Sequence, residues 1–147
     1  REFQIGEISL RKQILCLDFD GVVHSYVSGW KGARNIPDPP MPGALDFIGE
    51  ALAAGWDVVI HSSRSRHWGG ITAMRNWLRE HAGNQWDCMG ASLCDVRFTR
   101  WKPSAVLTID DRAMRFAGVW PSLSAAKSFK PYKHDMKLRT IAGGDIP

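Results

Sequence analysis

Apolar residues are arranged in two different patterns along the chain, and each pattern predicts a different secondary-structure element. The continuous apolar run Ile14-Leu15-Cys16-Leu17 is typical of a strand buried on both faces and predicts a first strand at residues 13–19. Shorter apolar runs at residues 56–60 and 105–109 predict two further strands, and residues 92–99 contain a less clear one. The chain therefore carries several short strands distributed over most of its length.

Apolar side chains recur every three or four residues in two other segments, which is the spacing of an amphipathic helix. The first segment lies between Gly43 and Gly55, and the second covers residues 70–82. Toward the C-terminus the pattern weakens, and we expect one short strand near residues 117–120 and a helix near residues 122–129.

Strands and helices thus alternate, which predicts an α/β fold: a three-layer, Rossmann-like parallel sheet with helices on both faces. A chain of 147 residues suits a single domain (1–147), with a core at about 13–130 and a loosely packed tail at 133–147. Residues 24–41 are rich in Gly and Pro and predict an irregular flap. Connections of this length are usually functional.

Composition narrows the picture only slightly. Apolar residues make up 44% and charged residues 23% of the chain, as in ordinary soluble proteins. No apolar run reaches the ~20 residues that span a bilayer, and no signal-peptide pattern is present. Cys16, Cys88 and Cys94 lack metal-ligand spacing and read as free thiols, so we expect a cytoplasmic protein without a membrane or obligate protein partner. The net charge of +4 fits an anionic substrate or simply a solvated surface.

Polar side chains stand where the predicted strands end. Asp18 and Asp20 follow the first strand at a spacing of two, which puts both on one side of an extended chain. Two neighbouring acids repel each other, and a bound cation is a common reason for such a pair. The plainer alternative is a polar turn formed by Asp20 and Gly21.

The other strand ends favour the cation. Ser62 follows the second strand, and Asp110 and Asp111 follow the strand at 105–109. Carboxyl ends of parallel strands meet at one edge of the sheet, so these groups should converge. Mg²⁺ prefers such oxygen ligands, and carboxylates with Mg²⁺ and a basic side chain catalyse phosphoryl transfer, in which an aspartate can be the nucleophile.

Four segments in this order resemble the motifs of the haloacid dehalogenase (HAD) superfamily of phosphohydrolases. They are Asp18-Phe19-Asp20-Gly21-Val22-Val23, then Ser62, Lys102-Pro103 and Asp110-Asp111. The resemblance covers about residues 13–120. It implies a Mg²⁺-dependent phosphohydrolase, and both gaps where family members insert a cap domain are too short for one here.

The resemblance also implies roles for individual residues. Asp18 would be the nucleophile, and Asp20 the general acid and then the general base. Ser62 would hydrogen-bond a phosphoryl oxygen. Mg²⁺ would be held by the Asp18 carboxylate, the Asp20 backbone carbonyl, and one or both of Asp110 and Asp111.

The positive partner of the phosphate is an open question at this stage. The resemblance points to Lys102, which stands eight positions before Asp110. If the strand begins at Ser104, Lys102 lies about 20 Å from the carboxylates, at the opposite end of the strand. Either residues 100–104 cross the site before the strand begins, or an arginine replaces Lys102. The candidates are Arg64, Arg97 and Arg100.

Several further residues have two readings. Ser63 and Arg64 follow Ser62 and are candidates for contact with the substrate phosphate. Arg64 could instead pair with a local acid. The remaining candidates are tryptophans. Trp30 and Trp68 lie beside Gly-rich turns and are candidates for substrate contact, whereas we expect core positions for Trp56, Trp77 and Trp120.

The expected substrate is phosphorylated, and two sizes of substrate fit the sequence. An uncapped site admits a large substrate such as a phosphorylated nucleic-acid end, while the 24–41 flap could cover a small nucleotide. A response-regulator receiver has its acidic pair first, the reverse of the order here, and a glycosyltransferase would not need Asp110 and Asp111. A non-catalytic or signalling phosphate-binding module remains the alternative.

Overall fold

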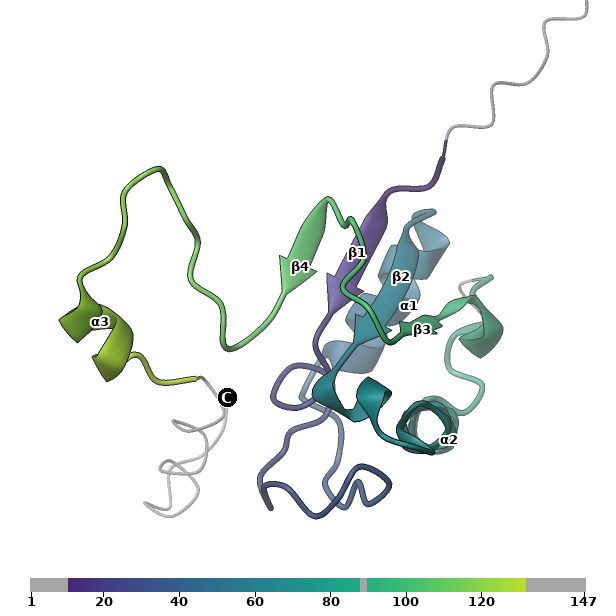
Figure 1. Cartoon of the computed structure of the whole chain (residues 1–147). Coiled ribbons are helices and arrows are strands. Elements are labelled where there is room, and N and C mark those ends of the chain that lie inside the picture. The colour runs from purple at the N-terminus through teal and green to yellow at the C-terminus, as the bar shows by residue number, and fades with distance from the viewer. Residues whose placement is uncertain (1–10, 88–89, 132–147) are drawn as a thin grey trace, which may run out of the picture.

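The computed structural model describes residues 11–87 and 90–131, and its body is a parallel sheet packed against helices (Figure 1). The elements run in the order β1 (Ile14–Leu17), α1 (Ala44–Ala53), β2 (Asp57–His61), the 3₁₀ helix η1 (Ser63–Arg66), α2 (Gly70–Ala82), the 3₁₀ helix η3 (Leu93–Asp95), β3 (Arg97–Thr99), β4 (Leu107–Ile109) and α3 (Leu123–Ser128). The four strands are all parallel, in the order β3-β2-β1-β4. The predicted α/β class with a parallel sheet is confirmed, and the arrangement is compatible with a Rossmann-like fold.

The register of the sheet brings the strand ends to one level. Leu17, the last residue of β1, pairs with Ile60 in β2 and with Ile109 in β4. The backbone N–H of Asp18 donates to the carbonyl of Ile109 at 2.9 Å, so the pairing continues one step past β1. The residues that follow β1, β2 and β4 therefore meet at the carboxyl edge of the sheet, as predicted.

The main core lies on one face of the sheet. Alternate residues of β1, Leu15 and Leu17, pack in one cluster with Ile48 from α1 and with Met74 and Leu78 from α2. These helical residues belong to the apolar stripes that predicted the two helices, and α2 has the predicted bounds. Burying an aliphatic side chain of this size contributes about 1.5–3 kcal/mol, so this cluster anchors the strand that carries Asp18.

The opposite face of the sheet differs from the prediction of helices on both faces. There, in the described part of the chain, residues 100–106 pass in front of β1 and β2 instead of a helix (Figure 1). The positive charge of Lys102 acts on the Cys16 thiol, whose pKa burial raises. This connection must cross three strand spacings, about 14 Å, which residues 100–106 span when extended but not when helical.

The flap at residues 24–41 has no helix or regular strand, as its Gly and Pro content predicted. Only isolated bridges occur at its two ends, where His24 pairs with Asp20 and with Pro40. No helix among the described residues is long and apolar enough to cross a membrane.

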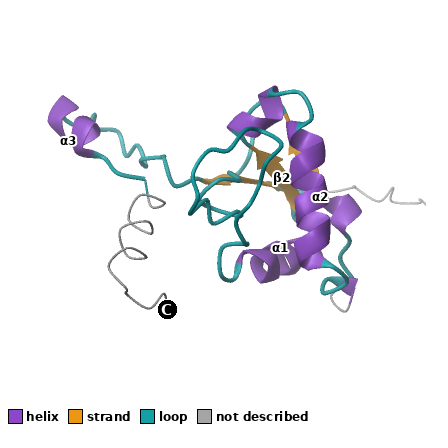
Figure 2. Cartoon of the chain, turned by 90° about the horizontal axis from the view of Figure 1, so that it is seen from below, coloured by secondary structure: helices purple, strands orange, loops and turns teal. Residues whose placement is uncertain are grey.

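The C-terminal part of the described chain departs most from expectation. No strand forms at residues 117–120, although α3 lies near the predicted helix, and α3 stands away from the sheet (Figure 2). Trp120 is 83% exposed, so its predicted core position is wrong, whereas Trp77 is buried and Trp56 packs against the core. The core cluster ends at Ile109, well before residue 130. The predicted tail at 133–147 and Cys88 lie outside the described residues.

Candidate functional site

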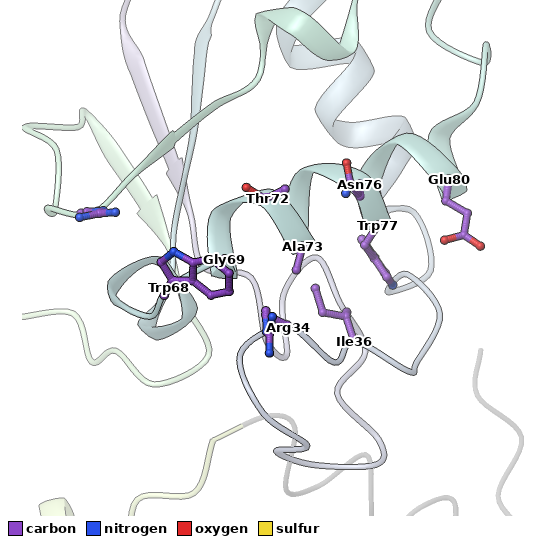
Figure 3. Close-up of a pocket in the computed structure, with 10 residues that line it drawn as sticks. Arg34, Ile36, Trp68, Gly69, Thr72, Ala73, Asn76, Trp77 and Glu80 are labelled. Carbon is purple, nitrogen blue, oxygen red and sulfur yellow. The ribbon is translucent and has the colours of Figure 1, made fainter.

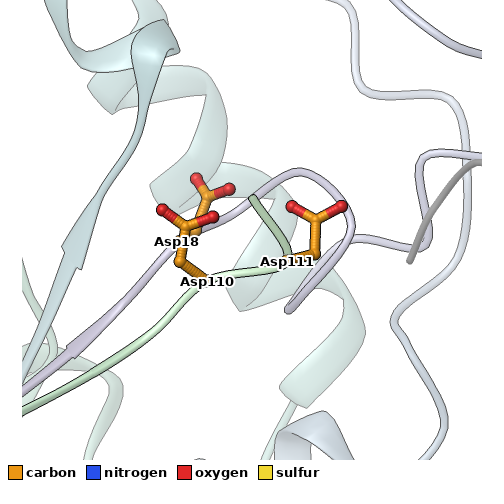
Figure 4. A group of neighbouring side chains, drawn as sticks. All are labelled: Asp18, Asp110 and Asp111. Atoms are coloured by element: carbon orange, nitrogen blue, oxygen red, sulfur yellow. The ribbon is translucent and has the colours of Figure 1, made fainter. Parts of the chain in front are cut away.

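Three carboxylates meet at the carboxyl edge of the sheet (Figure 4). They belong to Asp18, which follows β1, and to Asp110 and Asp111, which follow β4, and one oxygen from each lies within 4.8 Å of the others. Local hydrogen bonds hold two of them: Asp18 Oδ1 accepts from the Phe19 N–H at 2.8 Å, and Asp110 Oδ1 accepts from the Arg112 N–H at 2.8 Å. We refer to these three residues as the acidic trio.

The trio concentrates negative charge in a way that favours a bound cation. Carboxylates this close raise each other's electrostatic energy, and a divalent ion removes that cost. Mg²⁺ binds oxygens at about 2.0–2.1 Å, which sets ligand oxygens about 3–4 Å apart in an octahedron. Three oxygens within 4.8 Å can reach that geometry through small side-chain rotations, so the residues fit the ion. An octahedral ion would keep further positions for water or phosphate.

Asp20 points to different partners, although it lines the same pocket as Asp18 and Asp110. Its carboxylate is buried, and Nε of Arg64 donates to both of its oxygens, at 3.0 and 2.8 Å. Nδ1 of His24 lies 2.8 Å from one of the same oxygens. Arg64 and His24 are themselves fully buried, so these charge-assisted bonds form away from water.

The hydrogen bonds of His24 identify where its proton lies. The backbone N–H of Asp38 lies 3.2 Å from Nε2 of His24, and a backbone N–H can only donate. Nε2 is therefore the acceptor, and Nδ1 carries the proton that it donates to Asp20. Asp20 thus accepts from two donors and has no need of a proton of its own.

These contacts determine the ionisation of Asp20. Burial raises the pKa of the carboxyl, but the hydrogen bonds from His24 and Arg64 and the charge of Arg64 outweigh burial and hold the pKa below its usual value. A carboxyl held in this way stays ionised at neutral pH. The role of general acid that the family resemblance implies for Asp20 is therefore not favoured by its surroundings in this structure.

Arg64 fastens the flap to the strand ends. Its NH1 group donates to the backbone carbonyls of Gly32, Ala33 and Asn35 at 2.8, 3.1 and 3.2 Å. Its guanidinium also lies 4.8 Å from the centre of the Trp30 ring. Of the two readings of Arg64 from sequence, pairing with a local acid is the one this geometry favours. The local acid is Asp20.

Two members of the trio, Asp18 and Asp110, line a pocket of about 230 Å³ that contains most of the predicted site residues. The residues that line it are Asp18, Asp20, Tyr26, His61, Ser62, Ser63, Asp110 and Arg112. Ser62 caps η1 by accepting the Arg64 N–H at 3.2 Å and keeps its own O–H to donate, while Ser63 is exposed. Tyr26, His61 and Arg112 were not among the predicted site residues. Tyr26 lies in the flap, His61 is the last residue of β2 and Arg112 follows Asp111, and these positions were the available sequence signal.

Lys102 lies nearer the site than a long strand would allow. β4 begins only at Leu107, so residues 100–106 cross before the strand starts, as in the first alternative considered above, but the crossing that the structure shows is over the sheet. Burial lowers the pKa of His61, and the charges of Arg66 and Lys102 lower it further. Lys102 thus acts electrostatically on a residue that lines the pocket, although Lys102 itself is exposed.

The other arginines considered for that role have different surroundings. Arg97 pairs with Asp57 through two bonds of 2.8 and 2.7 Å, at the start of β2 and away from the carboxyl edge. Arg100 lines a separate groove next to α2. Lys102 is therefore the best supported cation among the residues that sequence proposed.

Comparison with known proteins adds no relative to this picture. No protein-family model, no curated protein and no solved structure matches the chain.

Proposed function

We propose that this protein is a Mg²⁺-dependent phosphohydrolase of the haloacid dehalogenase type that acts on phosphate monoesters through Asp18. The observation that carries the proposal is the meeting of Asp18, Asp110 and Asp111, with carboxylate oxygens within 4.8 Å, at a pocket that Asp18 and Asp110 line together with Ser62. Carboxylates from separate parallel strands rarely gather around one cavity without a cation to bind.

The proposed reaction has two steps. An oxygen of Asp18 attacks phosphorus, the bond from phosphorus to the ester oxygen breaks, and the released alkoxide takes a proton from water. A second water then attacks phosphorus, the bond to Asp18 breaks, and phosphate leaves as the carboxylate is restored. Asp110 and Asp111 would hold Mg²⁺ with Asp18. When bound, the ion supplies positive charge to the phosphoryl oxygens.

The remaining residues bind and position the phosphate in this proposal. The Ser62 O–H donates to a phosphoryl oxygen, and Lys102 contributes positive charge from residues 100–106, which its effect on the pKa of His61 supports. Asp20 keeps the flap in place through Arg64 and does not donate a proton. The substrate is a phosphate monoester, either a nucleotide or a phosphorylated nucleic-acid end.

The test is hydrolysis of p-nitrophenyl phosphate with Mg²⁺, with EDTA, and by the Asp18→Asn variant. We expect EDTA to abolish turnover and Asp18→Asn to lower it on the order of 10⁴-fold or more, as removal of a nucleophile does in other enzymes. Asp87→Asn, an exposed acid outside the pocket, is the matched control and should keep full activity. Turnover without metal, or full activity of Asp18→Asn, would refute the proposal.

A second candidate function follows from the surroundings of Asp20. A site whose second aspartate is held as a carboxylate by Arg64 could accept or bind phosphate without completing hydrolysis, as a non-catalytic or signalling module would. Release of one equivalent of p-nitrophenol per protein, followed by no turnover, would favour this module. Continued turnover after the first equivalent favours the phosphohydrolase.

A further inference from the structure

A second cavity, larger than the acidic pocket, lies between the flap and α2 (Figure 3). This groove has a volume of about 710 Å³, and Arg34 from the flap, Trp68 and the α2 residues Thr72 and Asn76 line it together with Arg100. The proposed phosphohydrolase reaction uses none of these five residues. The groove therefore needs an explanation of its own.

Trp68 is an exposed aromatic platform held next to a cation. Its side chain is 83% exposed, and the guanidinium carbon of Arg34 lies 5.2 Å from its ring centre. The stem of Arg34 packs against Gly69, where a Cβ would lie 2.8 Å from the Arg34 Cδ. Gly69 also has a φ of +74°, so the close approach and the backbone both favour glycine. A large flat ring left in water in a defined position suits stacking with a planar ligand.

Basic residues lie near both the groove and the acidic pocket. Arg100 lines the groove, and its backbone lies close enough to act on the pKa of His61, which lines the acidic pocket. Arg66 and Lys102 also lie close enough to His61 for their charges to lower its pKa. Cations thus lie both at the groove and near His61, at the acidic pocket. The acidic residue among those lining the groove is Glu80.

We propose that this groove binds a single strand of nucleic acid, with a base stacked on Trp68 and backbone phosphates paired with Arg34 and Arg100. A repeating polyanion with flat bases matches cations distributed along a path beside an exposed indole. A phosphopeptide offers one phosphate and no regular series of rings. The further step, in which a terminal phosphate of the strand enters the acidic pocket, rests on the proposed function.

The test measures binding of an unphosphorylated, fluorescein-labelled ten-nucleotide DNA by fluorescence anisotropy. Trp68→Ala should weaken binding roughly 5- to 150-fold, the range for one stacked base. The Arg34→Ala/Arg100→Ala double variant should reduce the slope of log K against log salt by about 1.4, or about 0.7 per phosphate contact. Trp120→Ala, equally exposed at 83%, and Arg115→Ala, also exposed, are matched controls outside the groove and should bind like the parent.

Three outcomes would overturn the groove proposal. They are unchanged binding by Trp68→Ala, equal losses in Trp68→Ala and Trp120→Ala, or a phosphopeptide that binds as tightly as the DNA with the same dependence on Trp68. Because the probe carries no terminal phosphate, its binding to the groove does not require the proposed hydrolysis. Absence of phosphatase activity with groove binding intact would count against the proposed function alone.

Discussion

Asp18 and Asp20 are separated by one residue, yet their carboxylates have opposite electrostatic surroundings. Asp20 is buried between Arg64 and His24, two basic side chains supplied by the protein itself. Asp18 instead lies with Asp110 at the carboxyl edge of the sheet, where negative charge accumulates. The protein therefore neutralises Asp20 with its own arginine and places Asp18 among further carboxylates, where we propose that a cation binds.

The backbone explains how two such close residues diverge. The alternation of a strand stops at Leu17, and the chain then turns, with the N–H groups of Val23 and His24 donating to the carbonyl of Phe19 at 3.0 and 2.8 Å. Gly21 has a φ of +90°, which this turn requires. The spacing of two therefore no longer puts both side chains on one side, as an extended chain would. One acid faces the flap and the other faces β4.

The largest effect on the unfolding free energy should come from removing the arginine that neutralises the buried Asp20 carboxylate. Arg64→Met keeps the apolar bulk but leaves the Asp20 carboxylate buried without its cation, which should cost about 3–5 kcal/mol of unfolding free energy. Urea denaturation followed by circular dichroism measures this loss. Arg97→Met is the matched control, because Arg97 makes a similar two-bond pair with Asp57 but is about half exposed. Its loss should be only about 0–1 kcal/mol.

Equal losses in these two arginine variants would contradict the comparison. They would mean that the burial of Arg64 adds nothing to its pair with Asp20. The m-value serves as an internal check, since a changed m-value would point to altered compactness of one of the two states rather than to the ion pair.

Much of the fold was predictable because it depends on local periodicity. The apolar stripe gave α2 its bounds, and the polar residues after β1 and β4 predicted the trio, because parallel strands end at one level. The position of Lys102 was not predictable in this way. It depends on β4 being short, and strand boundaries are the least certain feature of a sequence pattern.

The group with which a charged side chain pairs was the other feature that could not be predicted from the sequence. Arg64 lies 44 positions from Asp20, and nothing local distinguishes an arginine that binds substrate from one that pairs with an acid. Burial decides between the two, and burial is a tertiary property. The prediction for Trp120 was wrong for the same reason. Its apolar neighbours in the sequence predicted a core position, but Trp120 is exposed and α3 stands away from the sheet.

A smaller effect on the unfolding free energy should appear when one carboxylate of the acidic trio is removed. With free Mg²⁺ at 100 times its Kd, the parent gains about 2.7 kcal/mol of unfolding free energy from binding. Loss of one ligand in Asp110→Asn should weaken binding at least tenfold and reduce that gain to about 1.4 kcal/mol or less. Without metal, the variant should be as stable as the parent or slightly more stable, because one repelling charge is gone.

Urea denaturation in MgCl₂ and in EDTA measures both quantities for Asp110→Asn. Asp87→Asn, which changes an exposed carboxylate outside the trio, should gain as much from Mg²⁺ as the parent does. If Mg²⁺ raises the unfolding free energy of Asp110→Asn as much as that of the parent, the trio is not the cation site. The distinction between Asp18 and Asp20 would then be lost.

The smallest effect concerns the decrease of the unfolding free energy toward acidic pH, measured in EDTA. We call this part of the pH dependence the acid limb. The pKa of Asp20 is below its ordinary value of 3.8 in the folded protein, so between the two values the unfolded chain binds more protons. Stability from this group is complete above the unfolded value and is lost as pH falls toward the folded one. Urea denaturation between pH 2.5 and 7 should give Asp20→Asn a shallower acid limb, by at most about 1.4 kcal/mol per pH unit.

The slope is the informative quantity for Asp20→Asn, because this variant also leaves Arg64 buried without its acid and is less stable at every pH. Above pH 5, where Asp20 is ionised in both states, the curves of parent and variant should run parallel, which serves as the internal control. Identical acid limbs would mean that the folded protein does not lower the pKa of Asp20. A steeper acid limb in Asp20→Asn than in the parent would mean that folding raises this pKa. Asp20 would then regain the role of proton donor, and the contrast with Asp18 would reduce to geometry.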